Sequence, residues 1–464
     1  MASGSIPLEL GTERIGVLLR RYAIPGIIAM TASSLYNMVD SIFIGRMPGT
    51  GSLALSGLAI SFPLMNISAA LGTLVGVGAS TMISVLLGQK RYETARRVLA
   101  NEVTLNVIVG LFFTAVTLMF MDPILRAFGA TENTLPLARE YMIVISLGNT
   151  ITHLYFGLNS VIRASGNPRL AMGLTLFTVI SNAILDPVFI YVLGMGLRGA
   201  AIATLLCQTM ALSYSLVYFF HPERFLHLEM KHLFNLDWKI AGDSLKIGMG
   251  PFLMNLASCI VALFVNNQLL KYGGDLAIGA YGIVNRISFV FIMICMGFNQ
   301  GMQPIAGYNF GARQYRRVRK VYLLTAMWAT IACTVGFLIA ELIPGIAVRA
   351  FSNDPAMIEL ARRGLRLANC LFPIIGFQMV ATNLFQCLGM VRKSILLSLS
   401  RQLLFLVPCL YTLPLSLAQD GVWISFPISD LLAAALAAWL IVRLFRKFSL
   451  LKDGDDPAIL GSAI

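Results

Sequence analysis

The stretch SNAILDPVFIYVLGMGLRGAAIAT, residues 181–204, is apolar enough to lie in a membrane, yet it contains a carboxylate. Asp186 is followed at once by Pro187, and Asn182 lies about one helical turn before it. A charged residue at the centre of a lipid-facing helix costs about 2.5–3.5 kcal/mol on insertion scales. An acid, an amide and a helix breaker at such a depth therefore indicate a polar site inside a membrane protein.

The composition of the whole chain also indicates a membrane protein. Of its 464 residues, 57% are hydrophobic and 12% are charged, whereas a soluble domain has about 25% charged residues. The net charge of +13 comes from short basic clusters between apolar runs, which argues against nucleic-acid binding. The seven cysteines lie in apolar runs without the spacing of a metal site or a disulfide framework, and the four histidines are scattered. No cleavable signal peptide is evident in the first twenty residues.

Apolar runs long enough to cross a bilayer occur twelve times, because a spanning helix needs about 20 mostly apolar residues. The predicted architecture is therefore an all-α integral membrane protein with twelve transmembrane helices in two six-helix bundles. The twelve predicted spans are 22–44, 53–87, 98–120, 141–161, 169–192, 198–220, 247–270, 276–307, 322–344, 366–388, 394–416 and 422–444.

Basic residues are unevenly distributed between the two sets of loops. One set, which includes both termini, carries 24 Lys and Arg residues and the other carries nine. Because cytoplasmic loops are enriched in Lys and Arg, both termini are expected in the cytoplasm. The predicted divisions are an N-terminal six-helix lobe (1–220), a cytoplasmic linker (221–246), a C-terminal six-helix lobe (247–448) and a cytoplasmic tail (449–464).

The two halves repeat in one constant register, in which Gly166 corresponds to Gly389. Further matches in this register are GQKRY (88–92) with GARQY (311–315), ILRAF (124–128) with AVRAF (347–351), PLAR (136–139) with ELAR (359–362), and LALSG (53–57) with LAIGA (276–280). Because six spans separate the copies, both have the same topology. Two bundles related by an axis along the membrane normal suit a transporter with a central cavity, although a channel can also be duplicated.

Four polar residues of the first half are predicted to share one layer of the membrane. Asp40 and Asp186 each lie 18 residues past the start of a span that enters from the cytoplasm, about 27 Å along the helix. Asn182 and Thr204 fall at a similar depth. Two neighbouring carboxylates repel each other, so that one holds a proton. The set predicts a site for H⁺ or for a small hard cation such as Na⁺.

Other interpretations of these acids remain open. Asp186 can simply cap a new helical segment that starts at Pro187. Alternatively, the proline frees the carbonyl of Ala183 for the ion site. Asp40 can lie near the outer interface and reach for lipid headgroups.

The second half does not repeat the acids. In the register of the repeat Asp186 corresponds to Cys409 and Asn182 to Phe405, and alignment of Pro25 with Pro251 places Asn266 opposite Asp40. Ion coupling is therefore predicted for the first bundle only.

The remaining charged residues inside spans have simpler interpretations. Arg286 and Asp430 lie at similar depth with opposite sign, which predicts a structural ion pair, with a transport role as the alternative. Glu102 and Arg401 lie near span ends and are expected to reach toward the interface. His153 is expected to be a packing residue, with proton carriage as the alternative.

Adaptable methionine side chains suit a promiscuous pocket, with ordinary packing as the alternative. The chain has 22 methionines, among them Met30 and Met65 in the first two spans. Together with Tyr36 and Asn159, these two are predicted to line a substrate cavity.

Four motifs together resemble the multidrug and toxic compound extrusion (MATE) family. They are LYNMVDSIFIG (35–45), SNAILDPVFI (181–190), GMGLRGAAIAT (194–204) and GYNFGARQYRRVRK (307–320). The resemblance covers nearly the whole chain. The bacterial DNA-damage-inducible (DinF-like) branch looks most similar, because its coupling acids lie in the first lobe.

The resemblance implies two six-helix lobes in a V that export organic cations and amphipathic drugs in exchange for H⁺ or Na⁺. Asp40 matches the family's acid in the first helix. The residues that match its polar cluster are Asn182, Asp186 and Thr204, with Asn159 often grouped with them. Pro25 matches the proline at which the first helix bends when the ion site is loaded.

The predicted protein is thus an antiporter of the bacterial inner membrane and not an enzyme. It is expected to act as a monomer without a cofactor or a bound nucleic acid, in contact with lipid and with small amphipathic or cationic substrates. The alternatives are a flippase for a lipid-linked precursor, which would need a more cationic cavity, and a passive channel. A membrane-embedded enzyme would need a nucleophile or metal beside its acids.

Overall fold

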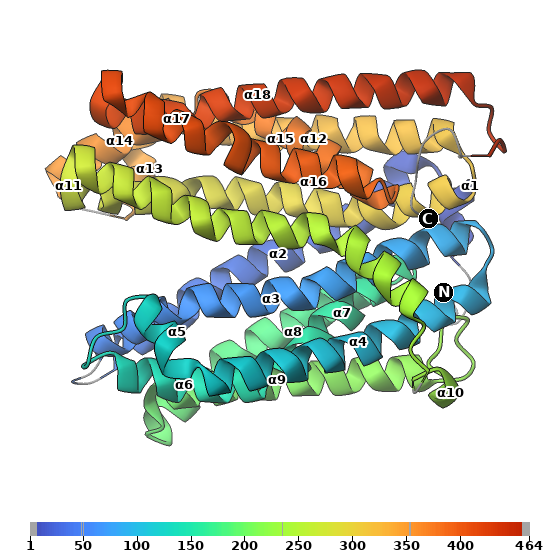
Figure 1. Ribbon diagram of the computed structural model, residues 1–464, viewed down its shortest axis with the longest axis horizontal. Coiled ribbons are helices and arrows are strands. Elements are labelled where there is room, and N and C mark those ends of the chain that lie inside the picture. The colour runs from blue at the N-terminus through green and yellow to red at the C-terminus, as the bar shows by residue number, and fades with distance from the viewer. Residues whose placement is uncertain (1–6, 48, 50, 234, 352–353, 457–464) are drawn as a thin grey trace. The chain divides into compact units, whose positions relative to one another are not determined.

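The computed structural model describes residues 7–47, 49, 51–233, 235–351 and 354–456, and these residues are helical almost throughout (Figure 1). The last eight residues of the predicted tail lie outside this description. The elements are α1 (Glu9–Thr12), α2 (Ile15–Gly45), α3 (Gly51–Gly88), α4 (Tyr92–Met119), α5 (Met121–Ala127), α6 (Leu135–Leu147), α7 (Asn149–Ala164), α8 (Pro168–Pro187), the π-helical η1 (Val188–Val192), α9 (Gly196–Phe220), α10 (Met230–Leu233), α11 (Trp238–Gly311), α12 (Tyr315–Leu342), α13 (Pro344–Arg349), α14 (Pro355–Asn369), α15 (Phe372–Cys387), α16 (Val391–Leu399), the π-helical η2 (Ser400–Leu406), α17 (Val407–Thr412) and α18 (Pro414–Leu450).

Ten helices in the described residues are long and apolar enough to cross a membrane, and the bent pair α14 and α15 makes eleven. The seventh and eighth predicted spans run together as α11, which breaks at Gly274, where φ is +68°. The fourth predicted span, 141–161, is divided by Gly148 between α6 and α7, which have 13 and 16 residues. Each piece alone is shorter than a spanning helix needs to be. This division is the reason why the predicted twelve spans are not recovered in full.

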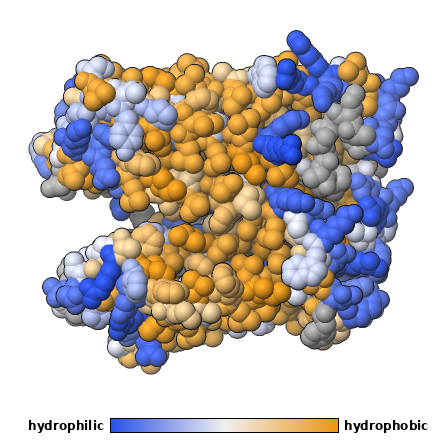
Figure 2. All heavy atoms as spheres, in the orientation of Figure 1, coloured by the Kyte–Doolittle hydropathy of each residue, from blue (hydrophilic) through white to orange (hydrophobic). Residues whose placement is uncertain are grey.

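Apolar side chains cover the middle of the helices, and polar side chains gather toward their ends (Figure 2). In the first half one buried apolar cluster includes Ile44, Leu125 and Tyr141. In the second half a comparable cluster surrounds Trp423, which is fully buried. The exposed apolar surface is consistent with the lipid-facing surface that the composition predicts.

The chain divides into two compact units whose boundaries fall inside helices. One unit comprises Thr31–Phe252 together with the described residues up to Leu10, and the other comprises Gly11–Met30 together with Leu253 onward. The first half of α2 therefore belongs to the unit that contains the second repeat. In the same way, the beginning of α11 belongs to the unit that contains the first repeat.

Two segments are thus exchanged between the units: the part of α2 up to Met30 and the part of α11 up to Phe252. Glycines allow these exchanged segments to pack closely. A Cβ atom on Gly78 of α3 would lie 1.9 Å from the carbonyl oxygen of Ser244 in α11, within the first unit. In the second unit a Cβ atom on Gly301 would lie 2.6 Å from the Cα atom of Ala23 in α2. Gly78 and Gly301 correspond to each other in the register of the repeat. Each exchanged segment thus contacts the glycine at the same position of the repeat, Gly78 in one unit and Gly301 in the other.

The turns of the two repeats also have matching backbones. Gly166 and Gly389, which follow α7 and α15, have φ values of +102° and +66°. Lys90 and Arg313 have φ values of +60° and +57°, which are unusual for residues with a side chain. Because both pairs match in the same register, the backbone confirms the sequence repeat.

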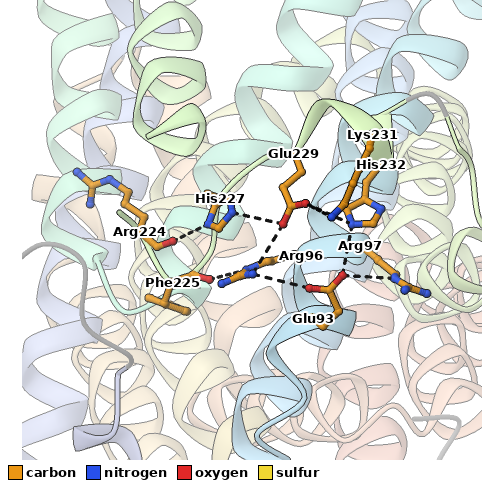
Figure 3. A network of polar contacts seen from close by, with 9 residues as sticks. All are labelled: Glu93, Arg96, Arg97, Arg224, Phe225, His227, Glu229, Lys231 and His232. Atoms are coloured by element: carbon orange, nitrogen blue, oxygen red, sulfur yellow. Dashed lines mark hydrogen bonds and ion pairs between the residues drawn. The ribbon is translucent and has the colours of Figure 1, made fainter. Parts of the chain in front are cut away.

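The segment after α9 is fastened to the beginning of α4 by a polar network (Figure 3). Glu229 accepts a hydrogen bond from Lys231 at 2.5 Å and lies 3.7 Å from the guanidinium of Arg96. Arg96 also donates to the carbonyl of Phe225 at 2.9 Å, and His232 lies 3.3 Å from Glu93. The predicted linker is therefore an ordered part of the first unit.

Candidate ion-binding site

Helices α2, α8 and α9 bring the four predicted ion-site residues together within the first unit. Asp40, Asn182 and Asp186 are all buried, with 6%, 2% and 0% of their surface exposed. Thr204 joins them through the hydrogen bond that Asn182 donates to its hydroxyl at 3.2 Å. The burial of Asp40 contradicts the alternative in which this carboxylate reaches for lipid headgroups.

The hydroxyl of Thr204 organises the site, and its one donor and two acceptor positions are all used in hydrogen bonds within the protein. It donates to the carbonyl of Ala200 at 3.1 Å and accepts from the amide of Asn182. The Tyr36 hydroxyl lies 3.0 Å away and must act as the donor, because the single proton of Thr204 is already used. Thr204 therefore positions Tyr36 and Asn182, and it differs from the free ion ligand that the sequence predicts.

Four buried oxygen atoms at the site lack a hydrogen-bond partner. They are one carboxylate oxygen of Asp40, the amide oxygen of Asn182 and both carboxylate oxygens of Asp186. The carboxyl groups of Asp40 and Asp186 are close enough to share a hydrogen bond when one of them carries a proton. Because buried acceptors are costly when left unsatisfied, the arrangement is suited to binding a proton or a small cation.

The backbone around Asp186 is irregular in a way that favours a binding site. α8 ends at Pro187, and the next five residues form the π-helical η1. Single π-helical turns inside α-helices are frequent at functional sites. No side chain caps η1, and the Asp186 carboxylate lacks a hydrogen-bond partner. These two facts argue against the alternative in which Asp186 only caps a new segment.

Two residues near the site escaped the sequence analysis. Tyr141 of α6 is 1% exposed and lies close enough to Asp40 and Asp186 for their charges to interact. Cys207 of α9 is similarly close to Asp186. Cys207 was detectable, because it lies three residues after Thr204 on the same helical face. Tyr141 carries no such signal, since α6 reaches the site only through tertiary packing.

Among the residues predicted to line a substrate cavity, Tyr36 contacts the ion site through Thr204. Asn159 donates to the carbonyl of Ala171 at 3.0 Å, fifteen residues before Asp186 on α8, or about 22 Å along that helix. Met65 packs against the apolar cluster of the first unit, and the Met30 sulfur lies in the second unit. Asn159 is thus not part of the ion site, and a cavity lined by the methionines stays a prediction.

Pro25 lies within α2, fifteen residues before Asp40, and the helix continues through it. A proline inside a helix removes one backbone hydrogen bond and favours bending. Bending at this position therefore stays a prediction.

Three further sequence interpretations need correction. Asp430 does not pair with Arg286, which is exposed; instead it accepts a hydrogen bond from Arg401 at 2.6 Å. The pairing holds Arg401 inside the second unit, so its expected reach toward the interface is wrong. Glu102 was also expected at an interface but is 1% exposed. In each of these cases the direction of the side chain depends on tertiary packing, which position along a helix does not reveal.

His153 is fully buried, as expected for a packing histidine. Its Nε2 atom lies 3.0 Å from the Ser68 hydroxyl, and its ring packs near Phe113.

Comparison with known proteins supports a single family for the whole chain. A family model described as MatE matches residues 25–188 and 247–412. The chain is 30% identical over 431 residues to the multidrug export protein MepA of Staphylococcus aureus (strain N315), and the match covers 92% of this chain and 93% of the relative. The MepA protein of Staphylococcus haemolyticus (strain JCSC1435) is 28% identical over 434 residues, with 93% and 94% covered.

A solved structure gives the same result. The fold is similar to the outward-facing conformation of a multidrug resistance MATE family transporter of the MOP superfamily. The TM-score is 0.89 at 25% sequence identity, and the alignment covers 96% of this chain and 99% of the other.

Proposed function

The chain belongs to the MatE family of membrane transporters, and we propose that it exports organic cations and other amphipathic drugs in exchange for H⁺ or Na⁺ entering the cell. The observation that carries this proposal is the buried pair Asp40 and Asp186 with its unpartnered oxygens. A site of this kind suits an ion that binds and leaves in each cycle. A permanent structural ion would need a more complete set of ligands.

The coupling follows from the elements that the site connects. The hydroxyl of Tyr36 on α2 is bonded to Thr204 on α9, and Asp40 on α2 faces Asp186 on α8. A proton or Na⁺ between the two carboxylates removes their repulsion and draws α2 toward α8. When the site is empty, the repulsion favours a different position of α2. Pro25 supplies a point at which α2 can bend between the two positions.

Coupled export requires that binding of the ion weakens binding of the drug. If ion loading of Asp40 and Asp186 weakens drug binding, drug binding must weaken ion loading by the same factor. Each net charge that moves down the membrane potential supplies about 2.3 kcal/mol per 100 mV. When one ion enters for each monovalent organic cation that leaves, no net charge moves, and the concentration gradient of the ion alone drives export.

The finer assignments are parts of the same proposal. Twelve spans in two lobes, both termini in the cytoplasm and a bacterial cell membrane follow from the charge distribution of the loops and from the bacterial relatives. The DinF-like branch is supported by the second unit, where Asp430 is already paired with Arg401. We further propose that the protein works as a monomer without a cofactor.

Proteoliposomes loaded with a fluorescent cationic dye test the proposal. An inward H⁺ gradient and an inward Na⁺ gradient are imposed separately on the unaltered protein, Asp40→Asn and Asp186→Asn. We expect one gradient to drive dye export and both variants to lose it. Glu359→Gln is the matched control, because this acid is exposed in a surface ion pair.

Each other outcome has a definite meaning. Export that persists in both aspartate variants would overturn the proposed ion site. Dye flux that never runs against its gradient would indicate a channel. No dye movement under either gradient would favour a substrate of the lipid-linked type.

A further inference from the structure

A second buried carboxyl group lies in the first unit, on a helix that contributes nothing to the ion site. Glu102 is the eleventh residue of α4 and is 1% exposed, about 15 Å from the start of that helix. The side-chain amide of Asn106 donates to its Oε1 atom at 2.6 Å. The Oε2 atom of Glu102 and the amide oxygen of Asn106 are both buried without a hydrogen-bond partner.

Two glycines make the space that this carboxyl group occupies. A Cβ atom on Gly157 of α7 would lie 1.8 Å from Glu102 Oε1 and 2.5 Å from the amide nitrogen of Asn106. A Cβ atom on Gly76 of α3 would lie 2.6 Å from the Cα atom of Gly157. The backbones of α3 and α7 therefore meet closely beside the carboxyl group. Any larger residue at position 157 would displace it.

No cation neutralises Glu102 within the described part of the chain. α3 carries no charged or titratable side chain. The titratable residues of α7 all face other groups: His153 Nε2 faces Ser68, the Tyr155 hydroxyl lies 3.1 Å from that of Thr178, and Arg163 donates to Ser160. On α4 itself, Arg97 pairs with Glu93. An ionised carboxylate at this position would be buried with an amide as its only partner and no cation to balance its charge, which is strongly unfavourable.

One proton satisfies both unpartnered atoms. In the ionised state Glu102 Oε2 and the amide oxygen of Asn106 are acceptors, so they cannot bond each other. A proton on Oε2 makes it a hydrogen-bond donor. The amide oxygen of Asn106 can accept this hydrogen bond, and it belongs to the same amide group whose nitrogen already donates to Oε1. Acid and amide then form a doubly hydrogen-bonded pair. Two free oxygens are too few for Na⁺ or another metal cation, which takes several oxygen ligands.

We propose that Glu102 and Asn106 form a proton-binding site of their own, separate from the Asp40–Asp186 pair. The site concerns proton binding by the chain, so it holds whichever substrate the transporter carries. It adds a second group in the first unit that can take up and release H⁺.

The second repeat shows that the helical scaffold does not need this acid. In the register of the repeat Glu102 corresponds to Thr325 and Asn106 to Ala329, and both are fully buried. Thr325 donates to the carbonyl of Val321 in its own helix at 2.7 Å, so its proton is satisfied locally. In the same register Gly76 and Gly157 correspond to Asn299 and Val380, both buried, so larger side chains on these two helices take the space that the acid and the amide occupy in the first repeat. The carboxyl group of Glu102 in the first repeat is therefore not required by the helical scaffold that the two repeats share.

Infrared spectroscopy tests the proposal, because a protonated carboxyl group has a carbonyl stretching band that a carboxylate lacks. The protein carrying Asp40→Asn and Asp186→Asn is measured at neutral pH with and without the further change Glu102→Gln. We expect a protonated-carboxyl band in the first protein and its loss in the second. We also expect Asn106→Ala to shift this band, because the carbonyl of the acid loses the hydrogen bond from the amide.

The controls separate this site from folding and from the proposed antiport. Glu102→Gln alone is measured against the unaltered chain in case the multiple variants do not fold. Glu102→Thr and Asn106→Ala combined with Gly157→Val introduce the residues that the second repeat has at these three positions, and this variant should also lack the band. A spectrum that Glu102→Gln does not change would overturn the proposal, whatever the dye-export assay shows. A band that Asn106→Ala leaves in place and unshifted would also overturn the acid–amide pair.

Discussion

The two units use the same helical scaffold, but they treat buried acids differently. In the first unit Asp186 and Asp40 have unpartnered oxygens, and Glu102 has only an amide as its partner. In the second unit Asp430 is equally buried, yet Arg401 donates to it at 2.6 Å. The turns Lys90 and Arg313 show that the backbone itself is closely repeated.

The difference distinguishes buried acids that can bind an ion from buried acids that stabilise the fold. An unpaired buried acid is costly to the fold, so it is retained where it can bind and release an ion. A paired acid such as Asp430 is already neutralised, and it joins η2 to α18 within the second unit. In the proposed mechanism the first unit binds the ion, and the second unit supplies a matched scaffold whose buried acid Asp430 is paired.

The largest expected effect comes from exchanging the acids between the repeats. Asp186→Cys introduces the residue of the second repeat, and Cys409→Asp introduces the acid there. We expect Asp186→Cys to abolish gradient-driven dye export, as Asp186→Asn does, because the carboxylate pair is lost. Adding Cys409→Asp should not restore export, because the second repeat has Asn266 where the first has Asp40. Export rates in proteoliposomes measure both.

Cys409→Ser serves as the control for this exchange and is expected to leave export unchanged. If the double exchange restored export, the two repeats would be functionally equivalent, and the proposed asymmetry would be wrong.

The next effect concerns the paired acid. Asp430→Asn removes one partner and leaves Arg401 without its charge partner, and breaking a buried ion pair costs about 3–5 kcal/mol. Because the Arg401 side chain is 25% exposed, we expect a free energy of unfolding lower by about 3 kcal/mol, the low end of that range. Thermal unfolding in detergent measures the loss.

Replacing both partners sharpens this result. Arg401→Met with Asp430→Leu should recover most of the stability, because apolar side chains need no partner. Equal loss of stability in the single and double variants would show that the ion pair contributes little. In contrast, loss of ion-coupled export in Asp430→Asn with normal stability would place ion chemistry in the second unit.

The sequence was most informative where a feature depends on position along a helix. Spans, the internal repeat and the shared depth of Asp40 and Asp186 follow from counting residues, since the rise per residue is constant. Partner choice does not follow from counting. The sequence placed Arg286 at the depth of Asp430 and Arg401 nearer a span end, yet tertiary packing pairs Asp430 with Arg401. Similarly, the burial of Glu102 depends on Gly157, which lies on another helix.

The exchanged segments predict a smaller effect. Gly78→Ala would place a methyl group 1.9 Å from the Ser244 carbonyl oxygen, and Gly301→Ala would place one 2.6 Å from the Cα atom of Ala23. Overpacking costs about 1–3 kcal/mol, and we expect the larger loss of stability for Gly78→Ala, where the contact is shorter. Thermal unfolding compares the two.

Gly242→Ala is the control for both glycines, because nothing lies within 4 Å of its added Cβ atom. Alanine is favoured over glycine inside a helix by about 0.5–1 kcal/mol, so this variant should gain stability. If all three variants behaved alike, the close packing of the exchanged segments would not contribute to the fold.

The smallest effect concerns the segment that fastens α9 to α4. In the second unit the segment after α18 contacts the beginning of α12 in a comparable way, since the Tyr315 hydroxyl donates to the carbonyl of Asp455 at 2.7 Å and Arg313 lies 3.3 Å from Asp456. The hydrogen bond from Lys231 holds the pKa of the Glu229 carboxyl below its ordinary value of 4.5. A carboxyl group whose pKa is lowered in the fold contributes stability above its unfolded pKa, and this contribution is lost as the pH falls through the folded value. We therefore expect the unaltered protein to have a higher unfolding temperature than Glu229→Gln at neutral pH. The difference should shrink as the pH falls below about 4.5, where Glu229 of the unfolded chain begins to take up a proton.

Arg97→Gln tests whether this pH dependence belongs to Glu229 itself. Arg97 pairs with Glu93 and not with Glu229, so Arg97→Gln should keep the pH dependence that Glu229→Gln removes. A difference between the unaltered protein and Glu229→Gln that stays constant from neutral pH to strongly acidic pH would show that Glu229 acts through packing and not through its charge. In that case the polar network of Figure 3 would be held by the contacts of Arg96 and His232 with the backbone and with Glu93.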